Sequence, residues 1–592
     1  MSKHQYNMGI VGNCSFLAYI DTDANVRWMC MPRFDSSFIF GSLLDSKKGG
    51  EFSICPSGKY TSQQHYVNNS NVLCTEFHTE RGKFRVVDCA PRFQNFERIF
   101  RPLMLIRKIE LIDGDPAVSV CCKPVGNYGQ VTAEMVNASN HIRYTGLGAQ
   151  VRLTTDISLN HVASEQPFIL DQDRYLIFTY GEPLEAPLTD TSEEFILKTN
   201  RYWRNWIKST YLPDIYQQEI IRSALVLKLH QYEDTGGIIA SGTTSLPEHH
   251  GSSRTWDYRY CWFRDTYYTL KAFNEIGHFD ELEKYFEYIQ NTLMRVDGRI
   301  QPLYTLNGNG NSLEEVHLDL EGYLGNQPVR IGNGAYTQIQ NDVYGQVLVS
   351  LLPLFVDKRL SFSKKQSYKS LIPRLLEWIE KTMDEPDAGL WEFRNVKQVH
   401  TYTMLFHWAG AKAALKIGQI MNDSHLISKA SQLEKTAGEQ IEKCYHKDRG
   451  YYAQARGSEN FDASTLKLIT MNYLDPASDV ARKHLEQLEQ RLKTDQGLFY
   501  RYVHADDFGK PEATFLVCAF WYVDALACVG RVDDAMKTLD GIVKYGNHLG
   551  IFSEDVGLDG SQWGNFPQTY SHVGMINAAF RISKKLDLPN YG

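Results

Sequence analysis

The stretch "LISKASQLEKTAGEQI", residues 426–441, places apolar side chains at the spacing of one helical face. These apolar positions, three or four residues apart, are Leu426, Ala430, Leu433, Ala437 and Ile441. Side chains at such spacings lie on the same side of an α-helix, whereas a half-buried strand has apolar residues at every second position. The stretch therefore predicts an amphipathic helix whose apolar face packs against other elements.

The same period continues through the chain after about residue 195. It places Leu282, Phe286, Ile289 and Leu293 on one face, and further helical segments begin near residues 340, 371, 402, 477, 513, 532 and 571. A dozen or so helices in succession form either an open solenoid or a closed barrel of helix pairs, and periodicity does not choose between them. We find no repeat of fixed length, which favours closure.

The part of the chain before about residue 190 has the pattern of short strands joined by turns. "VLCTEF" and "KFRVVDCA" flank "HTERG", and "LIRKIEL" and "AVSVCC" flank "IDGDP", so each set reads as strand, turn and strand. Many such strands predict an antiparallel β-sandwich. Because 592 residues exceed the size of a single core, we divide the chain into a β-sandwich domain at 1–195, a helical linker at 196–220 and a helical domain at 221–592.

Charge and composition exclude some classes of protein. The net charge is −8 and no block of Lys and Arg occurs, so the footprint of a nucleic-acid binder is missing. The N-terminus lacks the apolar core of a signal peptide, and eleven scattered cysteines without a C-x-x-C pair fit reduced thiols. The longest apolar run, residues 513–529, contains Asp524 and reads as a buried helix rather than a membrane span. We expect a cytoplasmic protein.

The stretch "DAGLWEFRN", residues 387–395, places Glu392 between Trp391 and Phe393. A carboxyl group beside apolar rings loses solvation of its charged form, which favours the protonated form near neutral pH. A general acid needs that form. In the alternative interpretation the rings pack inward and the glutamate points to solvent.

The segment "SSRTWDYRYCWFRDTYYTL", residues 252–270, concentrates polar groups among aromatic rings. Tyr258 and Trp262 offer flat faces that stack on a sugar ring. Arg264 and Asp265 offer donors and acceptors for its hydroxyl groups. A helix start with aromatic core residues and a local ion pair is an equally good interpretation of the same segment.

Two further loop segments carry candidate residues. Segment 316–345 contains Arg330 among glycines that permit tight turns, and a packed structural loop explains most of it equally well. Segment 551–579 contains Glu554 ahead of a glycine-rich loop and His572. Taken alone, Glu554 reads better as an exposed acid at a helix start.

Glycoside hydrolysis needs two carboxyl groups and no cofactor. Glu392 and Glu554 fill these two roles if the fold brings them together. No H-E-x-x-H motif occurs, and "EHH" at 248–250 lacks a third ligand. We therefore assign neither a metal nor a cofactor.

Several long motifs resemble those of one known family. They are "YNMGIVGNCSFLAYIDTDANVRWMCMPRFDSSFIFGSLLD", "GTTSLPE", "WDYRYCWFRDTYYTL", "HLDLEGYLGNQPVRIGN", "GLWEFR" and "SEDVGLDGSQWGNFPQTYSHVGMINAA". In this order they resemble the glucoamylase and trehalase family of glycoside hydrolases, family fifteen, in its prokaryotic form. The resemblance covers essentially the whole chain. It implies a β-sandwich followed by an (α/α)6 barrel of six helix pairs, the catalytic domain at 221–592.

The resemblance also implies roles for single residues. The family inverts the anomeric centre, with Glu392 of the G-x-W-E motif as the acid and Glu554, the first acid of the S-E-E/D motif, as the base. The second acid is Asp555 here, and because the base is the first member we expect catalysis to be unaffected. The residues implied to bind substrate are Tyr258, Trp262, Arg264, Asp265, Arg330, Trp391 and His572.

Among these residues, Arg264 and Asp265 are expected to bind hydroxyl groups of the terminal glucose. The three aromatic residues form the wall of the innermost subsite. Arg330 and His572 lie in motifs that line the pocket, and the resemblance gives them no defined role.

The sequence favours an inverting, exo-acting α-glucosidase of glucoamylase type that releases β-glucose from the non-reducing ends of short α-glucans. Trehalase is the nearest alternative, because some family members cleave α,α-trehalose. A non-catalytic glycan-sensing protein is an alternative from another class, and the presence of both glutamates argues against it. The expected partner is a small oligosaccharide or disaccharide, without nucleic acid or membrane. The linkage and the oligomeric state stay open.

Overall fold

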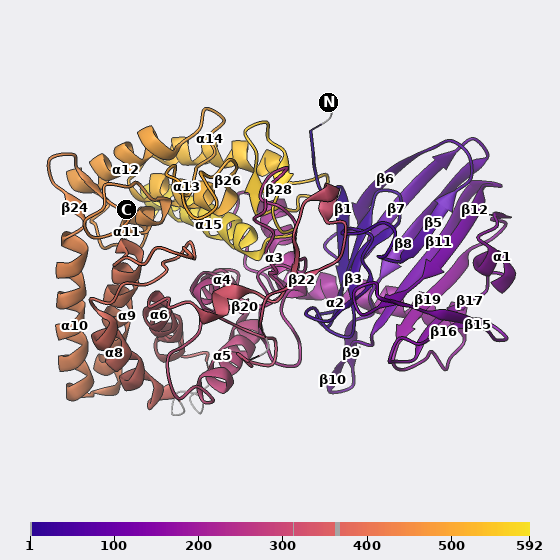
Figure 1. Cartoon of the computed structure of the whole chain (residues 1–592), viewed down its shortest axis with the longest axis horizontal. Coiled ribbons are helices and arrows are strands. Elements are labelled where there is room, and N and C mark those ends of the chain that lie inside the picture. The colour runs from indigo at the N-terminus through magenta and orange to yellow at the C-terminus, as the bar shows by residue number, and fades with distance from the viewer. Residues whose placement is uncertain (1–2, 312, 361–367, 592) are drawn as a thin grey trace.

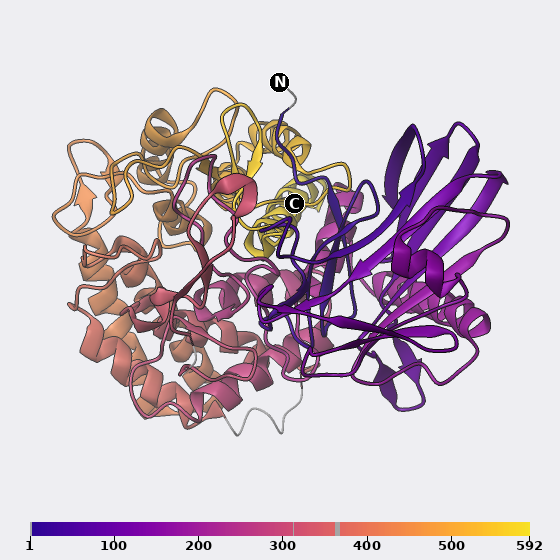
Figure 2. The same ribbon diagram turned by 45° about the vertical axis from the view of Figure 1, so that its right-hand side comes forward.

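Strands and helices occupy separate halves of the molecule, as the change of sequence period predicts (Figure 1). The computed structural model describes residues 3–311, 313–360 and 368–591. The strand-rich N-terminal half lies on one side and the helical half on the other, and the turned view in Figure 2 shows the same separation.

The N-terminal half is an antiparallel β-sandwich. One layer is a sheet with the strand order β15 (Glu134–Asn137), β16 (His141–Thr145), β17 (Val151–Thr155), β19 (Arg174–Tyr180), β11 (Met104–Gly114), β8 (Gly82–Cys89), β7 (Leu73–Thr79) and β6 (Tyr60–Tyr66). The other layer contains two sheets: β1 (Met8–Gly12), β2 (Leu17–Asp21), β3 (Val26–Cys30) and β4 (Phe38–Phe40), then β18 (Phe168–Ile169), β12 (Ala117–Lys123) and β5 (Glu51–Pro56).

Apolar side chains from both layers fill the space between them. Phe40, Phe52 and Phe178 come from β4, β5 and β19, and their ring centroids lie 5.3 to 6.0 Å apart. All three are fully buried. Burial of such rings is the main stabilising contribution to a sandwich of this kind. The predicted sandwich is confirmed.

One of the two predicted strand pairs is a hairpin and the other is not. β7 and β8 pair with each other around "HTERG", as predicted. β11 and β12 flank "IDGDP" but do not pair, because β11 lies between β8 and β19 while β12 lies between β5 and β18 in the opposite layer. The turn chemistry marks a reversal of the chain correctly, but it does not specify which layer the next strand joins.

The last strand of the sandwich, β19, ends at Tyr180, and helix α2 (Leu188–Lys208) follows. The boundary predicted at residue 195 therefore falls inside this helix. Helix α3 (Gln217–Leu229) begins the helical half.

The helical half is a closed barrel with an inner and an outer layer. The inner helices in the described part of the chain are α4 (Phe263–Glu275), α6 (Asp342–Val356), α9 (Thr401–Met421), α11 (Lys467–Thr470), α13 (Leu516–Cys528) and α15 (Thr569–Tyr591). Each contacts the next, and α15 contacts α4, which closes the ring. The outer helices are α3, α5 (Phe279–Leu293), α8 (Leu371–Thr382), α10 (Ser424–Glu442), α12 (Asp479–Leu492) and α14 (Val532–Ile542). The closed (α/α)6 barrel is confirmed.

Burial along the helices agrees with the sequence pattern. All five apolar residues predicted to face inward from 426–441 are buried in α10. Every residue of α13 is buried, and its Asp524 pairs with Arg581 of α15 at 2.7 Å. No helix in the described ranges is both long and apolar enough to span a membrane.

Buried polar contacts join the sandwich to the barrel. Trp28 of β3 donates to the carbonyl oxygen of Gly242 at 2.9 Å. Arg259, fully buried, pairs with Asp257 at 2.7 Å and donates to the carbonyl oxygen of Ser36 at 2.8 Å. A buried guanidinium left without these partners would be costly, so the two domains hold one fixed arrangement.

Candidate active site

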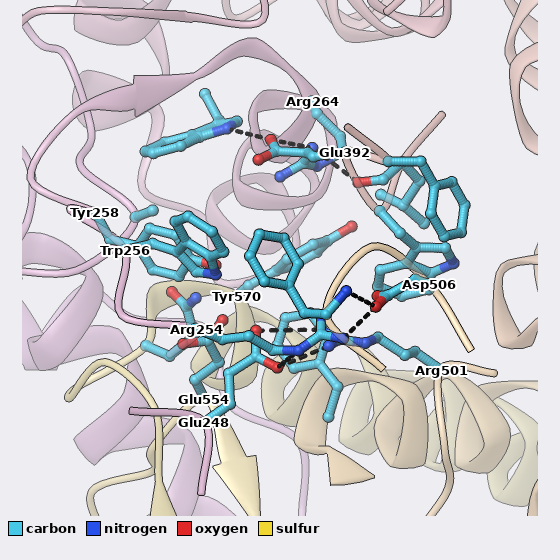
Figure 3. A pocket seen from close by; sticks show the side chains of 18 of the residues that line it. Glu248, Arg254, Trp256, Tyr258, Arg264, Glu392, Arg501, Asp506, Glu554 and Tyr570 are labelled. Carbon is cyan, nitrogen blue, oxygen red and sulfur yellow. Dashed lines mark hydrogen bonds and ion pairs between the residues drawn. The ribbon is translucent and has the colours of Figure 1, made fainter. Parts of the chain in front are cut away.

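A pocket opens at the end of the barrel where the inner helices begin. It holds about 780 Å³ of space not filled by protein atoms, part of it open to solvent. Its walls come mainly from the segments that lead into α4, α9, α13 and α15. Figure 3 shows Glu392 and Glu554 on opposite sides of this pocket.

The loop that carries Glu392 is fixed from behind by a buried acid. Asp387 accepts hydrogen bonds from the backbone N–H of Asn341 at 2.8 Å and from the Thr403 hydroxyl at 2.9 Å. Gly389 has a φ of +67°, and a Cβ there would lie 2.6 Å from the His400 ring. Glu392 itself has a φ of +60°, a conformation that costs a non-glycine residue about 1 to 3 kcal/mol. The surrounding bonds hold the loop in this strained form.

The carboxylate of Glu392 lies among donors, and not in the apolar environment that its two aromatic neighbours predict. Its Oε1 accepts from Trp262 Nε1 at 2.8 Å, from Arg264 Nη1 at 3.1 Å and from Gln340 Nε2 at 3.4 Å. The prediction of an apolar setting is wrong because the loop aims the side chain across the pocket, toward residues far away in the sequence.

Arg264 and Asp265 line the pocket beside Glu392. Arg264 Nε lies 3.3 Å from Asp265 Oδ1, and Arg264 Nη1 donates to the carbonyl oxygen of Leu390 at 3.0 Å. Burial raises the pKa of Asp265 to about 6, against the lowering effect of Arg264. The pair places hydrogen-bond donors and acceptors on the inner wall of the pocket.

The predicted aromatic wall is present. Tyr258 and Trp262 meet edge to face with ring centroids 5.3 Å apart, and both line the pocket with Trp391. Trp391 donates from Nε1 to Asp462 at 2.9 Å, and its ring lies 5.9 Å from that of Phe515. These bonds fix the orientation of the rings.

Glu554 is held by backbone bonds on both sides. Its N–H donates to the Asn565 carbonyl oxygen at 3.1 Å, and its carbonyl oxygen accepts from the N–H of Leu516 at 2.9 Å. Its side-chain Oε2 accepts from the N–H of Asn565 at 3.0 Å. Glu554 directly precedes strand β27 (Asp555–Val556), which lies between β26 (Thr514–Phe515) and β28 (Gln562–Trp563). The carboxyl group thus has little freedom to move.

Two more buried acids lie next to Glu554. One carboxylate oxygen each from Glu248, Glu554 and Asp555 lies within 4.8 Å of the others. Burial raises the pKa of Glu554 to about 8, and the like charge of Glu248 adds to the effect. The pKa of Asp555 is also raised well above its ordinary value, first by burial and then by Glu554. Burial and mutual repulsion therefore favour the protonated forms of Glu554 and Asp555.

Two arginines balance the charge of this cluster. Arg501 donates to Glu248 Oε2 at 2.7 Å, and Arg254 Nε lies 3.7 Å from the same oxygen. Arg254 also donates to Asp506 on the far side (Figure 3). Because Glu248 is already paired with these two cations, the arrangement offers no reason to assign a metal to the three acids.

Sequence reasoning missed the role of these partners in the site. Glu248 stands out in the sequence only as part of "EHH", and Arg501 and Asp506 lie in "RYVHADDFGKP" at 501–511, outside the candidate segments. Segment 501–511 contains acids, aromatic rings and a glycine and has no helical period. The other candidate loops were identified by the same composition, so this segment could have been found in the same way.

The N-terminal arm, residues 3–8, braces the loop behind Glu554. Tyr6 donates its hydroxyl to the Gly564 carbonyl oxygen at 3.0 Å, and the His4 ring stacks on Trp563 with centroids 4.2 Å apart. Asn547 donates to the carbonyl oxygen of Tyr6 at 2.8 Å. Figure 2 shows the start of the chain beside the yellow C-terminal segments. The sandwich domain thus contributes directly to the support of this acid.

Two residues predicted to bind substrate do not line the pocket. Arg330 lies behind Trp256, with its guanidinium carbon 4.6 Å from the ring centroid, and pairs with Glu315 at 2.9 Å. His572 is fully buried, where its Nε2 accepts from the N–H of Phe552 at 3.2 Å. Both residues support the loops around the pocket, and their place in the motifs gave no sign of which way they point.

The family is decided by a match to its sequence model. The model for glycosyl hydrolases family 15 matches residues 214–580, which cover most of the chain. The chain belongs to glycosyl hydrolase family 15. A second model, that of the trehalase-like N-terminal domain, matches residues 5–163 of this family 15 enzyme.

Relatives and solved structures agree with this assignment. A trehalase of Thermoplasma volcanium is 31% identical and aligns with 99% of this chain and 94% of its own length. A trehalase of Mycobacterium tuberculosis is 29% identical over 95% of this chain and 87% of its own. A bacterial glucoamylase crystallised with acarbose has the same fold, with a TM-score of 0.71 and 15% identity over 100% of this chain and 96% of that one.

The close contact between Gly564 and the acids gives a test of the geometry. A Cβ at Gly564 would lie 2.7 Å from Glu554 Oε2 and 2.9 Å from Asp555 Oδ2. Gly564→Ala is expected to displace the Glu554 carboxyl group and to lower kcat at least about tenfold, because misplaced catalytic groups cost that much or more. Steady-state kinetics and a thermal melt measure the two effects.

The matched control is Gly530→Ala. Gly530 has a φ of +87°, close to the +72° of Gly564, but nothing lies within 4 Å of the position that a Cβ would take there. Both variants carry the backbone strain of a positive φ, and only Gly564→Ala moves the acids. Equal activity of the two variants would show that Gly564 does not position Glu554.

Proposed function

We propose that this family 15 enzyme is a trehalase, which hydrolyses α,α-trehalose to two glucose molecules. The observation that carries the proposal is the alignment of relatives named trehalase with nearly the whole chain, both domains included. The sequence alone favoured a glucoamylase-type enzyme with trehalase as the alternative. The relatives support the alternative better, since the likeness to glucoamylase at 15% identity concerns the fold.

The site supports hydrolysis by a pair of acids. Glu392 and Glu554 line one pocket from opposite sides, as Figure 3 shows, although they lie in separate loops. In this proposal Glu392 protonates the bridging oxygen and Glu554 accepts a proton from the attacking water. The N–H of Asn565 and Arg501 both favour the charged form of Glu554 that a base requires.

The inner wall supports recognition of a glucose ring. Arg264 and Asp265 offer polar contacts beside Glu392, while Tyr258, Trp262 and Trp391 offer ring faces. A second ring then lies toward the mouth of the pocket. One glucose in the inner subsite and one in the outer subsite account for both halves of trehalose.

Product analysis tests the proposed substrate and the stereochemistry together. The purified enzyme is incubated separately with trehalose, maltose, isomaltose and maltoheptaose, and released glucose is measured. We expect kcat/KM to be highest for trehalose, by about tenfold or more, because recognition of both rings adds discrimination. A preference for maltose or maltoheptaose would overturn the proposal in favour of a glucoamylase-type enzyme.

Proton NMR in the first minutes shows the anomers before mutarotation. Inversion at one of the two anomeric carbons of α,α-trehalose gives one β-glucose and one α-glucose, because the leaving glucose keeps its configuration. A retaining mechanism gives α-glucose alone. An early spectrum without the β-anomer would exclude the inverting pair.

Substitution of the two glutamates tests their roles. Glu392→Gln and Glu554→Gln are each expected to lower kcat by about 10² to 10⁴, the range that general acid–base catalysis contributes. Folding is checked by circular dichroism, with Glu134→Gln as a control on the exposed strand β15. Retention of more than about a tenth of the activity in either variant would contradict its role.

Burial of Glu554, together with the charge of Glu248, is expected to determine the position of the acidic limb of the pH profile. The base must be ionised, and burial together with Glu248 raises the pKa of Glu554 to about 8. Activity should therefore increase with pH up to and beyond neutrality. Glu248→Gln removes the like charge, which lowers the pKa of Glu554, so the limb of kcat/KM should move to lower pH.

The acidic limb of the kcat/KM profile is measured by initial rates at fixed ionic strength, with Glu134→Gln again as the control. A thermal melt of Glu248→Gln checks that Arg501 and Arg254 tolerate the neutral amide. A limb that stays in place, or moves to higher pH, would show that Glu248 does not act on the base.

A further inference from the structure

We infer that the hairpin tip at 506–509 caps the outer end of the pocket and limits the substrate to two sugar rings. The inference rests on the proposed trehalase activity and specifies the length of its substrate. Three of the four residues at the tip, Asp506, Asp507 and Phe508, line the pocket that contains both glutamates.

The tip is a tight, well-defined turn. The N–H of Asp506 donates to the Gly509 carbonyl oxygen at 3.1 Å, and the N–H of Gly509 donates back at 3.2 Å. Asp506 Oδ1 accepts from the N–H of Phe508 at 2.8 Å, and Gly509 has a φ of +93°. Because the turn satisfies its own backbone groups, Asp507 and Phe508 project from a rigid base.

One side of the tip is fastened to the loop of Glu392. The Asp507 carboxylate accepts from the backbone N–H of Arg394 at 2.5 Å and from that of Asn395 at 3.2 Å. A carboxylate that accepts two backbone N–H bonds is a strong attachment. These two residues lie two and three positions after Glu392, so the tip lies against the loop of the proposed acid.

The other side of the tip is fastened to the segment at 254–256. Arg254 donates to Asp506 and, at 3.2 Å, to the Gly509 carbonyl oxygen. The Phe508 ring meets the Trp256 ring edge to face at 5.3 Å and lies 5.1 Å from the Arg254 guanidinium. The Tyr502 hydroxyl donates to Asp506 from below the turn. The tip therefore joins both sides of the pocket mouth.

This double attachment carries the inference. A third sugar ring beyond the outer subsite needs the space that the tip occupies, and to gain it the chain must break the contacts of Asp507 or of Arg254. The Asp506 side chain is only 5% exposed, so its separation from Arg254 leaves a buried charge without its cationic partner. Phe508, in contrast, is 40% exposed at the mouth, with apolar surface for the outer ring of a disaccharide.

The test compares two substrates with the same linkage. One is trehalose, and the other is the trisaccharide in which a third glucose is attached to O4 of one trehalose ring. Its unmodified ring enters the inner subsite, so the third glucose points outward against the tip. The wild-type enzyme is expected to have a kcat/KM for the trisaccharide at least about tenfold below that for trehalose, a steric discrimination of the usual size for pockets.

Two variants open the cap in different ways. Asp507→Ala removes the attachment to the Glu392 loop, and Phe508→Ala removes the ring at the mouth. In both, the ratio of kcat/KM for trehalose to that for the trisaccharide is expected to fall at least about threefold. Phe96→Ala, at a 90% exposed ring of the sandwich domain, is the matched control and should leave the ratio unchanged.

Failure of the cap and failure of the trehalase proposal give different results. If trehalose is cleaved but the wild-type ratio is near one, or if both variants leave it unchanged, the cap is refuted and the trehalase proposal stands. If trehalose is not cleaved and maltose is, the trehalase proposal fails, and the ratio of maltose to maltotriose then tests the cap in the same variants.

Discussion

An α-helix satisfies its own backbone hydrogen bonds everywhere except at its ends, and this constraint places the chemistry of the enzyme at one end of the barrel. Each inner helix is preceded by an outer one that runs the opposite way, so the inner helices run in the same direction. Their sides are buried against one another, so the polar side chains that line the pocket come from the loops ahead of these helices and from their first turns.

The pocket is therefore surrounded by helix N-termini. Residues in contact with it, or with Glu392, directly precede or begin α4, α6, α13 and α15. The N-terminal end of a helix carries partial positive charge and free N–H groups, and it stabilises negative charge nearby. A site with several acids in so small a volume benefits from this arrangement.

Charge at the site is distributed over one connected set of side chains. Glu248 lies beside the proposed base and pairs with Arg501, while Arg254 lies near Glu248 and bonds to Asp506 at the hairpin tip. Arg254 thus links the acid cluster to the mouth of the pocket. A change of charge at one end of this set alters the electrostatic field at the other end. The effects of two substitutions within the set are therefore not expected to add.

Sequence periodicity was enough to predict the two domains and most helix starts, because burial of one face repeats at every turn of a helix. Local pattern failed where the outcome depended on distant partners: β12 joined the opposite layer from β11, and the carboxylate of Glu392 met Arg264, 128 residues earlier. The family motifs contain Glu392 and Glu554, which line one pocket. They also contain His572, which is buried outside that pocket. A family motif thus predicts that a loop lies near the pocket, but it does not predict which of its side chains point into the pocket.

The N-terminal arm makes the barrel depend on the chain that precedes it. Residues 3–8 belong to the sandwich by sequence, yet they complete the support of Glu554 in the barrel through Gly564 and Trp563. A gene rearrangement that moved the barrel to another context without this arm would deliver a pocket with an unsupported acid. The His4 ring would no longer stack on Trp563, and the Gly564 carbonyl oxygen would lose its hydrogen bond from Tyr6. The barrel expressed without residues 3–8 would therefore hold the loop behind Glu554 less firmly.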